Sequence, residues 1–226
     1  MKSHHWDALF DSNIELYRGA RPKRAERVLE FLRDIDLMPA SVLEMGAFSG
    51  KDIRYLSEKL PQTLCCSLDK ERGVFDRAAS AATSCVVADA FHMPFRDSAF
   101  EITFHSGLIV VFDDRQSAKI VEEQLRVTSG YAFVFAHNRW NFIDVLVSAA
   151  KRLRGNSLFR YRRFTKGLLR GMVPDNGALV RIEYVDNMLV NATRRRAPKL
   201  VGVVSRMAGF ADAVLCNEIL MIVKAK

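Results

Sequence analysis

The sequence is poor in cysteine and has no long apolar run. Its four cysteines, Cys65, Cys66, Cys85 and Cys216, form no C-x-x-C pair. No set of histidines and cysteines has the spacing of a zinc site, so we predict reduced thiols and no bound metal. No apolar stretch approaches the roughly 18 residues of a membrane span, and the first residues lack the pattern of a signal peptide. These absences argue against an integral membrane protein and predict a cytoplasmic one.

The composition is that of an ordinary globular protein with an excess of positive charge. The chain is 49% hydrophobic and 27% charged, with no internal repeat or low-complexity tract. A chain of this length buries roughly 70–75% of the surface that it exposes when unfolded, so one domain is expected. The 34 Lys and Arg residues against 26 Asp and Glu residues give a net charge of +8.

The positive charge is concentrated in the C-terminal third. Residues 145–174 contain no acidic residue and eight Lys or Arg, and residues 187–211 contain no acidic residue and five. Such segments attract polyanions, phosphorylated ligands or an anionic membrane surface. The alternative is a solvated face that only keeps the protein in solution.

Apolar strands alternate with helical segments along most of the chain. Strands that are apolar on both faces and alternate with helices predict a parallel sheet covered by helices. We therefore expect an α/β, doubly wound fold, in which ligands bind outside the carboxyl ends of the strands. The predicted strands cover 41–45, 63–68, 84–88, 101–105, 131–136, 181–185 and 219–224.

The helices are predicted from apolar residues at 3.6-residue spacing and from their caps. Pro22 suits the first position of a helix within the N-terminal 35 residues. Asp113 or Asp114 caps a later helix, and Gly130 is expected to stop that helix after Val127. The other predicted helices cover 52–60, 72–82, a basic region from about 141 to about 170, and 199–208.

A glycine-bearing turn and two carboxylates follow the first three strands. The segment Glu44 to Gly50 (EMGAFSG) lets the backbone approach a ligand closely before the next helix begins. A simple strand-to-helix connection is the alternative. Asp69, nineteen residues after Gly50, can accept both hydroxyls of a ribose, and Asp89 can accept from an amine such as that of adenine. The combination predicts a nucleoside cofactor, and the G-x-x-x-G spacing disfavours a nicotinamide one.

The order of these motifs resembles that of the class I S-adenosylmethionine-dependent methyltransferases. The resemblance rests on VLEMGAFSGKD, SLDKE, VVADAFHMPFRDSAFEITF, and EEQLRVTSG followed by YAFVF, over about residues 40–138. It implies a mostly parallel, seven-stranded, Rossmann-like sheet with helical lid insertions, and S-adenosyl-L-methionine as the cofactor. It also implies one methyltransferase domain over 1–226, consisting of an N-terminal helical lid (1–38), a cofactor-binding core (39–138), a basic helical acceptor lid (139–180), and C-terminal strands and a helix (181–226).

The resemblance assigns roles to the residues of these motifs. Glu44 would order the loop and hold the amino group of the cofactor, and the loop itself would surround the methionine moiety. Asp69 would hold the ribose, and Asp89 would meet the adenine amine. Phe48 stands where the family has the middle glycine of the loop. The implied cofactor-binding residues are Tyr17, Glu44, Gly46, Ala47, Phe48, Gly50, Asp69, Lys70, Asp89, Ala90, His105 and Ser106.

Methyl transfer requires an aligned acceptor and, for a hydroxyl or ammonium acceptor, a base. His105 and His137 each end a predicted strand and are the candidate catalytic residues, since an unperturbed histidine has a pKa near 6.5. The alternative for each is a hydrogen-bonded structural histidine. Val110 and Val111 stand where many relatives carry an acid–histidine pair, so a mechanism that uses that pair is excluded. The candidate acceptor-binding residues, which could instead begin a helix, are Asn138, Arg139 and Trp140.

The acceptor class follows from what is missing after the fourth and fifth strands. Neither an Asp/Asn-Pro-Pro-Tyr signature nor a cysteine stands there, which disfavours methylation of nucleic-acid bases. We therefore expect a methyltransferase that acts on the oxygen or nitrogen of a small molecule, which the basic segments allow to be anionic. RNA or another polyanion is the alternative acceptor, and a non-catalytic S-adenosylmethionine-binding subunit is the third hypothesis. The sequence does not predict the oligomeric state.

Overall fold

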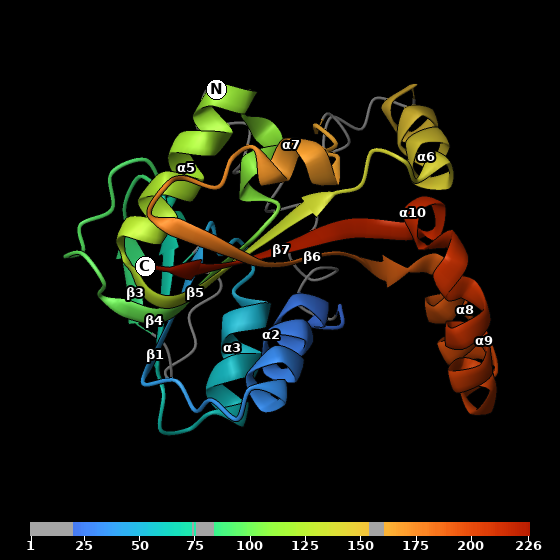
Figure 1. Ribbon diagram of the computed structural model, residues 1–226, viewed down its shortest axis with the longest axis horizontal. Coiled ribbons are helices and arrows are strands. Elements are labelled where there is room, and N and C mark those ends of the chain that lie inside the picture. The colour runs from blue at the N-terminus through green and yellow to red at the C-terminus, as the bar shows by residue number, and fades with distance from the viewer. Residues whose placement is uncertain (1–19, 74, 76–83, 154–160) are drawn as a thin grey trace.

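The computed structural model describes residues 20–73, 75, 84–153 and 161–226. Within them, seven strands form one sheet in the order β3-β2-β1-β4-β5-β7-β6 (Figure 1). Strands β1 to β5 are parallel, and β7 is antiparallel to both β5 and β6. The predicted doubly wound, mostly parallel, seven-stranded sheet is confirmed. The strands are β1 (Ser41–Met45), β2 (Leu64–Asp69), β3 (Ser84–Val87), β4 (Phe100–Ser106), β5 (Thr128–His137), β6 (Gly177–Asn187) and β7 (Cys216–Ala225).

Helices cover both faces of the sheet. In Figure 1, α2 and α3 lie on one face, and α5 and α7 lie on the other. The α5 helix begins with a capping box, in which Asp113 accepts from the backbone of Gln116 and the Gln116 side chain accepts in return. The helices are α2 (Lys23–Asp34), α3 (Lys51–Lys59), α5 (Asp114–Arg126), α6 (Phe142–Leu153), α7 (Lys166–Arg170), α8 (Met188–Arg196), α9 (Val201–Ala208) and α10 (Asp212–Leu215), with 3-10 turns η1 (Leu108–Val111), η3 (Pro198–Leu200) and η4 (Gly209–Ala211).

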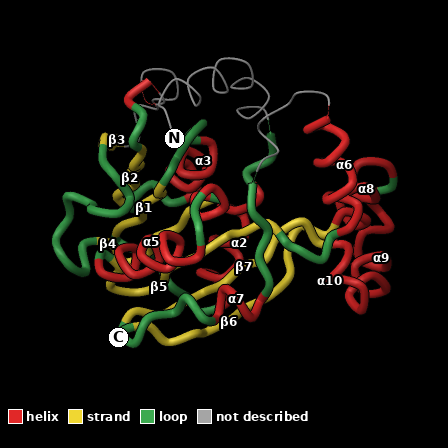
Figure 2. The backbone as a smooth tube through the Cα atoms, turned by 90° about the horizontal axis from the view of Figure 1, so that it is seen from above, coloured by secondary structure: helices red, strands yellow, loops and turns green. Residues whose placement is uncertain are grey.

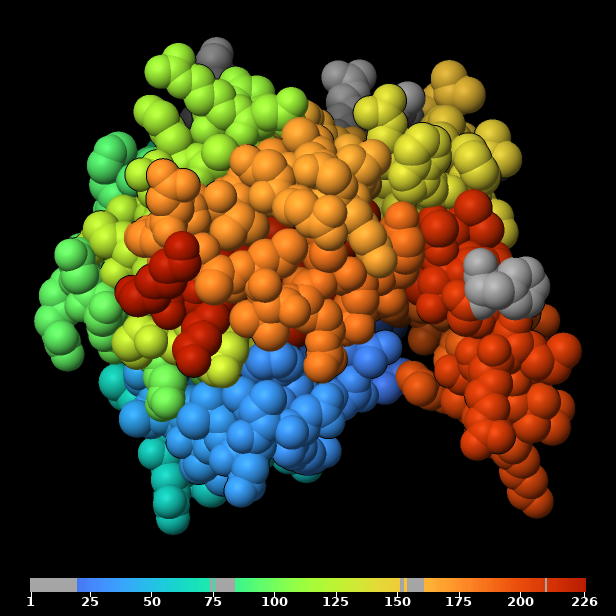
Figure 3. Space-filling model, viewed as in Figure 1, coloured from blue at the N-terminus to red at the C-terminus, as the bar shows by residue number. Residues whose placement is uncertain are grey.

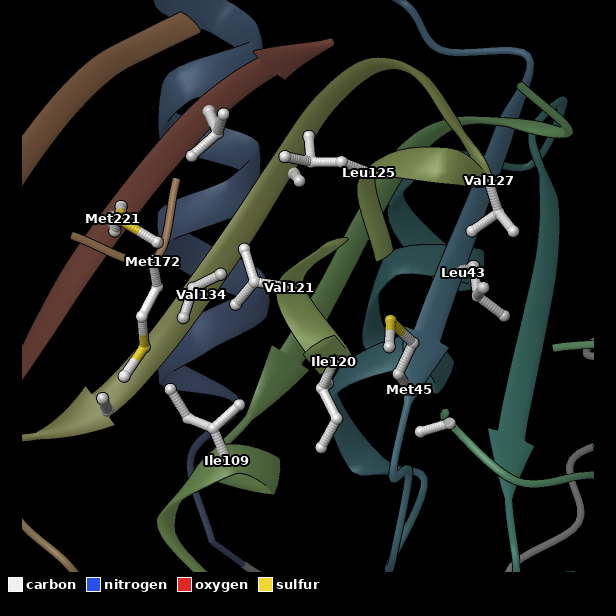
Figure 4. Close-up of a cluster of buried hydrophobic side chains, with 14 of the residues drawn as sticks. Leu43, Met45, Ile109, Ile120, Val121, Leu125, Val127, Val134, Met172 and Met221 are labelled. Atoms are coloured by element: carbon white, nitrogen blue, oxygen red, sulfur yellow. The ribbon is translucent and has the colours of Figure 1, made fainter. Parts of the chain in front are cut away.

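Each face of the sheet has its own apolar core because successive strand residues point to opposite sides. Met45 and Val134 pack with Ile109 and Val121 on the face that α5 covers (Figure 4). The opposite face packs against α2 and α3. Each fully buried side chain of this size contributes about 1.5–3 kcal/mol. The core residues of that second face include Val28, Leu32, Ile53, Leu56, Ile102, Phe104, Phe133 and Phe135.

Four helices gather at the end of the sheet toward which β5 and β6 run. Figures 1 and 2 both place α6, α8, α9 and α10 there. The sequence did not predict α8, which begins where the side chain of Asn187 accepts from the backbone of Leu189 and Val190. No helix within the described ranges is both long enough and apolar enough to cross a membrane.

The structure corrects the expectation that Gly130 stops a helix. The helix ends at Arg126, and Gly130 lies inside β5, where two β5 residues, Ser129 and Gly130, oppose the single residue Glu101 of β4. This is a β-bulge, and glycine suits it because a Cβ at residue 130 would lie 2.5 Å from the carbonyl oxygen of Glu101. The helix predicted over 72–82 lies mostly outside the described residues, as does the N-terminal segment 1–19.

Replacing Gly130 with alanine is expected to destabilise the fold by about 2–3 kcal/mol, the cost of overpacking against a fixed backbone. Urea unfolding measures the change. Gly202→Ala is the matched control, since a Cβ at Gly202 in α9 meets nothing within 4 Å. There alanine is expected to stabilise by about 0.5–1 kcal/mol through its helix propensity. Equal effects of the two substitutions would contradict the proposed contact.

Candidate functional site

The loop after β1 has three residues in the left-handed backbone region. Gly46, Phe48 and Gly50 have φ values of +64°, +47° and +61°. Phe48 therefore keeps a conformation that glycine adopts freely, at a cost of about 1–2 kcal/mol for a residue with a Cβ. A Cβ at Gly46 would lie 3.0 Å from the side chain of Leu108. The missing side chain thus lets η1 approach the loop closely.

Asp69 ties this loop to the end of β2. Its Oδ2 accepts from the backbone N–H of Phe48 at 3.1 Å, and its Oδ1 accepts from that of Glu71 at 3.0 Å. Burial raises the pKa of the half-buried Asp69 carboxyl, while these backbone donors oppose the rise. The carboxylate is held in one orientation at the carboxyl end of β2, next to the loop of β1.

Lys70 and Asp89 pair across the ends of β2 and β3. Lys70 Nζ lies 2.9 Å from Asp89 Oδ2, and the backbone N–H of Phe91 donates to Asp89 Oδ1 at 3.1 Å. Burial acts to raise the pKa of Asp89, but the bonds from Phe91 and Lys70 outweigh it and leave that pKa below its ordinary value. Ala90 follows and is buried. A charged acceptor therefore lies two strands from the glycine loop.

Glu44 lies beneath the loop, with a second carboxyl close by. Both Glu44 and Asp52 are only 2% exposed. Glu44 Oε2 accepts from the backbone N–H of Ile53 at 3.0 Å, and Asp52 Oδ1 accepts from that of Ala25 at 3.2 Å. Burial raises the pKa of Glu44 well above its usual range, and the charge of Asp52 adds to this effect.

The Arg126 side chain, which the sequence analysis did not identify, holds the loop after Asp89. Arg126, in the last turn of α5, donates to the carbonyls of Phe95 and Met93 at 2.9 and 3.1 Å. It also pairs with Asp97 at 2.7 Å and Glu123 at 2.8 Å. Glu123 in turn accepts from the backbone of Met93 at 2.7 Å. The two sequence motifs DAFHMPFRD and EEQLR are thus joined in space by these contacts.

The two candidate histidines lie on opposite faces of the sheet. His105 is aligned with Met45 and Val134, whose side chains belong to the apolar core under α5. His137, three residues beyond Val134 on the same strand, is aligned with Glu218 on the α2 face. The structure therefore does not bring the two rings together.

His105 is fully buried, and neither ring nitrogen has a hydrogen-bond partner in the described part of the chain. Burial lowers the pKa of His105 to about 3, so the ring is neutral at physiological pH. A neutral imidazole with this pKa is a weak base. Ser106 follows it at the end of β4 and is half-buried. The catalytic role of His105 stays a prediction.

His137 belongs to a polar cluster at the end of β5. Its ring stacks on Tyr161, with ring centroids 4.0 Å apart, and its Nδ1 has no partner among the described residues. The Tyr161 hydroxyl lies 3.1 Å from Ser148 Oγ and 3.3 Å from Asp144 Oδ2. Arg163 pairs with Asp144 at 2.8 Å. Burial lowers the pKa of His137, and the charge of Glu218 partly opposes this.

The three predicted acceptor-binding residues have different surroundings. Asn138 is buried and donates to the carbonyls of Ala213 and Cys216 at 2.8 and 2.9 Å, so it joins β5 to the α10–β7 corner. Arg139 is exposed, and Trp140 is 45% exposed. Only the last two can meet a ligand without rearrangement. Tyr17 lies outside the described residues.

A polar groove opens between α2, β6 and α8. Figure 3 shows it as the notch between the blue α2 and the red α8 and α9. Ion pairs bridge it: Arg24 bonds to Glu218, and Lys23 lies 2.6 Å from Asp186. Asp186 also accepts from Asn191 at 2.6 Å. The two ion pairs join α2 to β7 and β6, and the bond from Asn191 joins α8 to the end of β6.

The residues of the loop fit a nucleoside cofactor that carries an amino acid. The loop has a glycine where a side chain would meet η1, a fixed carboxylate at the end of β2, and a buried carboxyl beneath it. Among the described residues, no three His, Cys, Asp or Glu side chains gather as a metal ion requires. The loop and the ends of β2 and β3 present the carboxylates of Asp69 and Asp89 as hydrogen-bond acceptors.

Comparison with known proteins agrees with this geometry. No family model matches the chain. It is 27% identical over 128 residues to malonyl-[acyl-carrier protein] O-methyltransferase of Halorhodospira halophila, covering 53% of this chain and 43% of that protein. It is 26% identical over 96 residues to the enzyme of the same name from Geobacter sulfurreducens, covering 40% and 36%. The matched segment thus spans less than half the length of these relatives.

Solved structures share the fold at low sequence identity. Magnesium protoporphyrin IX methyltransferase of Synechocystis, with bound S-adenosylhomocysteine, matches with a TM-score of 0.63 and 8% identity over 90% of this chain and 82% of that one. A SAM-dependent methyltransferase of Methanosarcina mazei matches with a TM-score of 0.60 and 15% identity over 86% and 96%. The strand order and these matches show that the chain has the fold of the class I S-adenosylmethionine-dependent methyltransferases.

Proposed function

We propose that the chain transfers the methyl group of S-adenosylmethionine to an oxygen or nitrogen of a small, anionic acceptor. The single observation that supports this most is the arrangement at the ends of β1, β2 and β3. There Asp69 accepts from the backbone N–H of Phe48, and Glu44 lies buried beneath the loop. Asp89, which follows the neighbouring strand β3, accepts from the backbone N–H of Phe91. The curated relatives are O-methyltransferases by name, which supports an oxygen acceptor.

In this proposal the loop holds the methionine part of the cofactor, Asp69 the ribose hydroxyls, and Asp89 with Lys70 the adenine. The cofactor supplies an activated methyl group, so the protein mainly aligns the acceptor and removes its proton. We assign the proton-accepting role to His137 rather than His105, because the Nδ1 of His137 is unpartnered within the described residues and lies in a polar cluster. The exposed Arg139 and Trp140, in the segment 139–180, would meet the acceptor.

Calorimetric titration with S-adenosylhomocysteine tests cofactor binding, and transfer of a labelled methyl group to small carboxylic acids tests the acceptor class. Binding without transfer to any acceptor would favour a non-catalytic subunit. Transfer to RNA instead would overturn the small-molecule assignment. Absence of binding in folded protein would contradict the proposed function as a whole.

Cofactor affinity is expected to rise with pH because of Glu44. Burial raises the pKa of this carboxyl in the free protein, and the ammonium group of the bound ligand stabilises its charged form. The complex therefore holds fewer protons than the free protein, and binding strengthens as the pH rises toward the raised pKa. Titrations with S-adenosylhomocysteine between about pH 5.5 and 8, in buffers of different ionisation enthalpy, measure the released protons.

Glu44→Gln should bind more weakly and show a flatter pH profile, because it has no proton to release. Glu30→Gln is the control, since its carboxylate is 54% exposed on α2. A profile of unchanged slope in the Glu44 variant would show that another group titrates.

A further inference from the structure

The helix α6 turns its apolar side outward. Five of its large apolar side chains are exposed, among them Leu146 at 70% and Leu153 at 90%. Their spacing places all of them on one face of the helix. A surface helix of a globular protein normally buries such a face against the core. The exposed apolar side chains of α6 are Phe142, Ile143, Leu146, Val147 and Leu153.

The inward side of α6 is polar, and this fixes its orientation. Ser148 is 2% exposed and bonds to the hydroxyl of Tyr161, while Asp144 accepts from Arg163. The guanidinium of Arg163 also lies over the Tyr161 ring, 4.8 Å from its centroid. The helix cannot roll its apolar side inward without breaking these contacts. The outward apolar face is therefore held by the structure.

A second apolar row lies on η3 and α9 at the same end of the molecule. Leu200, Val203 and Met207 are 54%, 58% and 67% exposed, and their i, i+3, i+7 spacing places them on one side of the helical segment. The side chain of Asn141, just before α6, bonds to Met188 at the start of α8. Figures 1 and 2 place α6, α8 and α9 at the same end of the sheet, with α6 above and α8 and α9 below the sheet in Figure 1.

Exposed cations lie on α8, η3 and α9 and just before α6. Residues 145–153 of α6 and residues 187–211, which include α8, η3 and α9, contain no acidic residue. Basic and apolar side chains on neighbouring helices are complementary to an anionic lipid surface. Each Lys or Arg near such a surface contributes about 1 kcal/mol to the free energy of binding. Trp140 lies at the start of this region, and tryptophan favours the water–lipid interface. The exposed cations are Arg139, Arg194, Arg195, Arg196, Lys199 and Arg206.

We propose that this end, formed by the exposed apolar side chains of α6, η3 and α9 and the cations around them, docks on the surface of an anionic lipid bilayer. The apolar rows enter the headgroup region, and the arginines contact lipid phosphates. RNA would satisfy the cations but would leave eight large apolar side chains in water. A second copy of the chain would bring the same positive surface against itself. Bilayer docking does not require methyl transfer, so each proposal can fail without the other.

Co-sedimentation with vesicles tests this proposal on the full chain. The probes are vesicles of phosphatidylcholine alone and vesicles that contain about 30% phosphatidylglycerol. We expect at least tenfold tighter binding to the anionic vesicles, weakened by salt. The double variant Leu146→Glu with Met207→Glu should lose at least tenfold of that binding, because it places charge in both apolar rows.

A matched control distinguishes binding through this surface from non-specific binding of exposed apolar side chains to vesicles. Met38 and Leu64 are 66% and 59% exposed but lie at the amino edge of the sheet, before β1 and at the start of β2. Met38→Glu with Leu64→Glu should bind anionic vesicles like the wild type. Equal loss in both double variants would overturn the proposal, as would absence of vesicle binding. A dimer seen by light scattering that Leu146→Glu with Met207→Glu dissociates would also overturn it, and so would salt-sensitive RNA binding tighter than vesicle binding.

Discussion

Replacing Asp69 with alanine is expected to weaken binding of S-adenosylhomocysteine about 30-fold, equivalent to about 2 kcal/mol. The carboxylate is held at the end of β2 by the backbone N–H groups of Phe48 and Glu71, with its remaining acceptor capacity available to the ribose hydroxyls. The substitution removes charge-assisted hydrogen bonds and releases the loop after β1. Titration calorimetry measures the change in affinity.

Two further substitutions separate ligand contact from loop support. Asp69→Asn keeps an oxygen that can accept one backbone bond but loses the charge, so its affinity should fall between those of the wild type and the alanine variant. Asp34→Ala, at the exposed end of α2, should leave affinity unchanged. Wild-type affinity in a folded Asp69→Ala protein would remove the ribose role from this residue.

Removing the Arg126 guanidinium is expected to destabilise the fold by about 3 kcal/mol and to weaken cofactor binding as well. The guanidinium donates hydrogen bonds to two backbone carbonyls and two carboxylates. Alanine would leave these four acceptors without that donor. The loop that begins at Asp89 would lose its support at the far end. Urea unfolding and titration with S-adenosylhomocysteine together measure both effects.

Arg126→Lys distinguishes the effect of the positive charge from the effect of the planar guanidinium geometry. Lysine keeps the positive charge but cannot bond to separated acceptors in one plane, so this variant should lose about 2 kcal/mol of stability. Arg115→Ala, exposed on the same helix, should change stability by less than about 0.5 kcal/mol. If lysine restored full stability, the positive charge alone would account for the contribution of Arg126.

The sheet could be predicted from the sequence because its strands are apolar on both faces and separated by clear helical periods. The predicted 84–88 and 219–224 lie within one to three residues of β3 and β7. The placement of Asp69 and Asp89 at strand ends was also predictable, since each follows an apolar run. These features are local, and hydrophobic periodicity records them directly.

The features that were not predictable depend on contacts between distant segments. Gly130 follows a helix closely enough to look like its stop, and only the bulge opposite Glu101 explains it. Nothing in the sequence places His105 and His137 on opposite faces. Which side chains of a strand point to which face of the sheet depends on how the strands pair. The outward apolar side of α6 depends in the same way on distant contacts, because Arg163 and Tyr161 bind Asp144 and Ser148 on the opposite, polar side of the helix.

The antiparallel course of β7 determines where a label can be attached. Because β7 runs against β5 and β6, residue 226 lies at the opposite end of the sheet from α6 and α9 (Figure 1). Its backbone N–H donates to the carbonyl of Asn176 at 3.0 Å. A tag joined after Lys226 would therefore immobilise the protein on a sensor surface with α6 and α9 directed toward the solution, where injected vesicles can reach them.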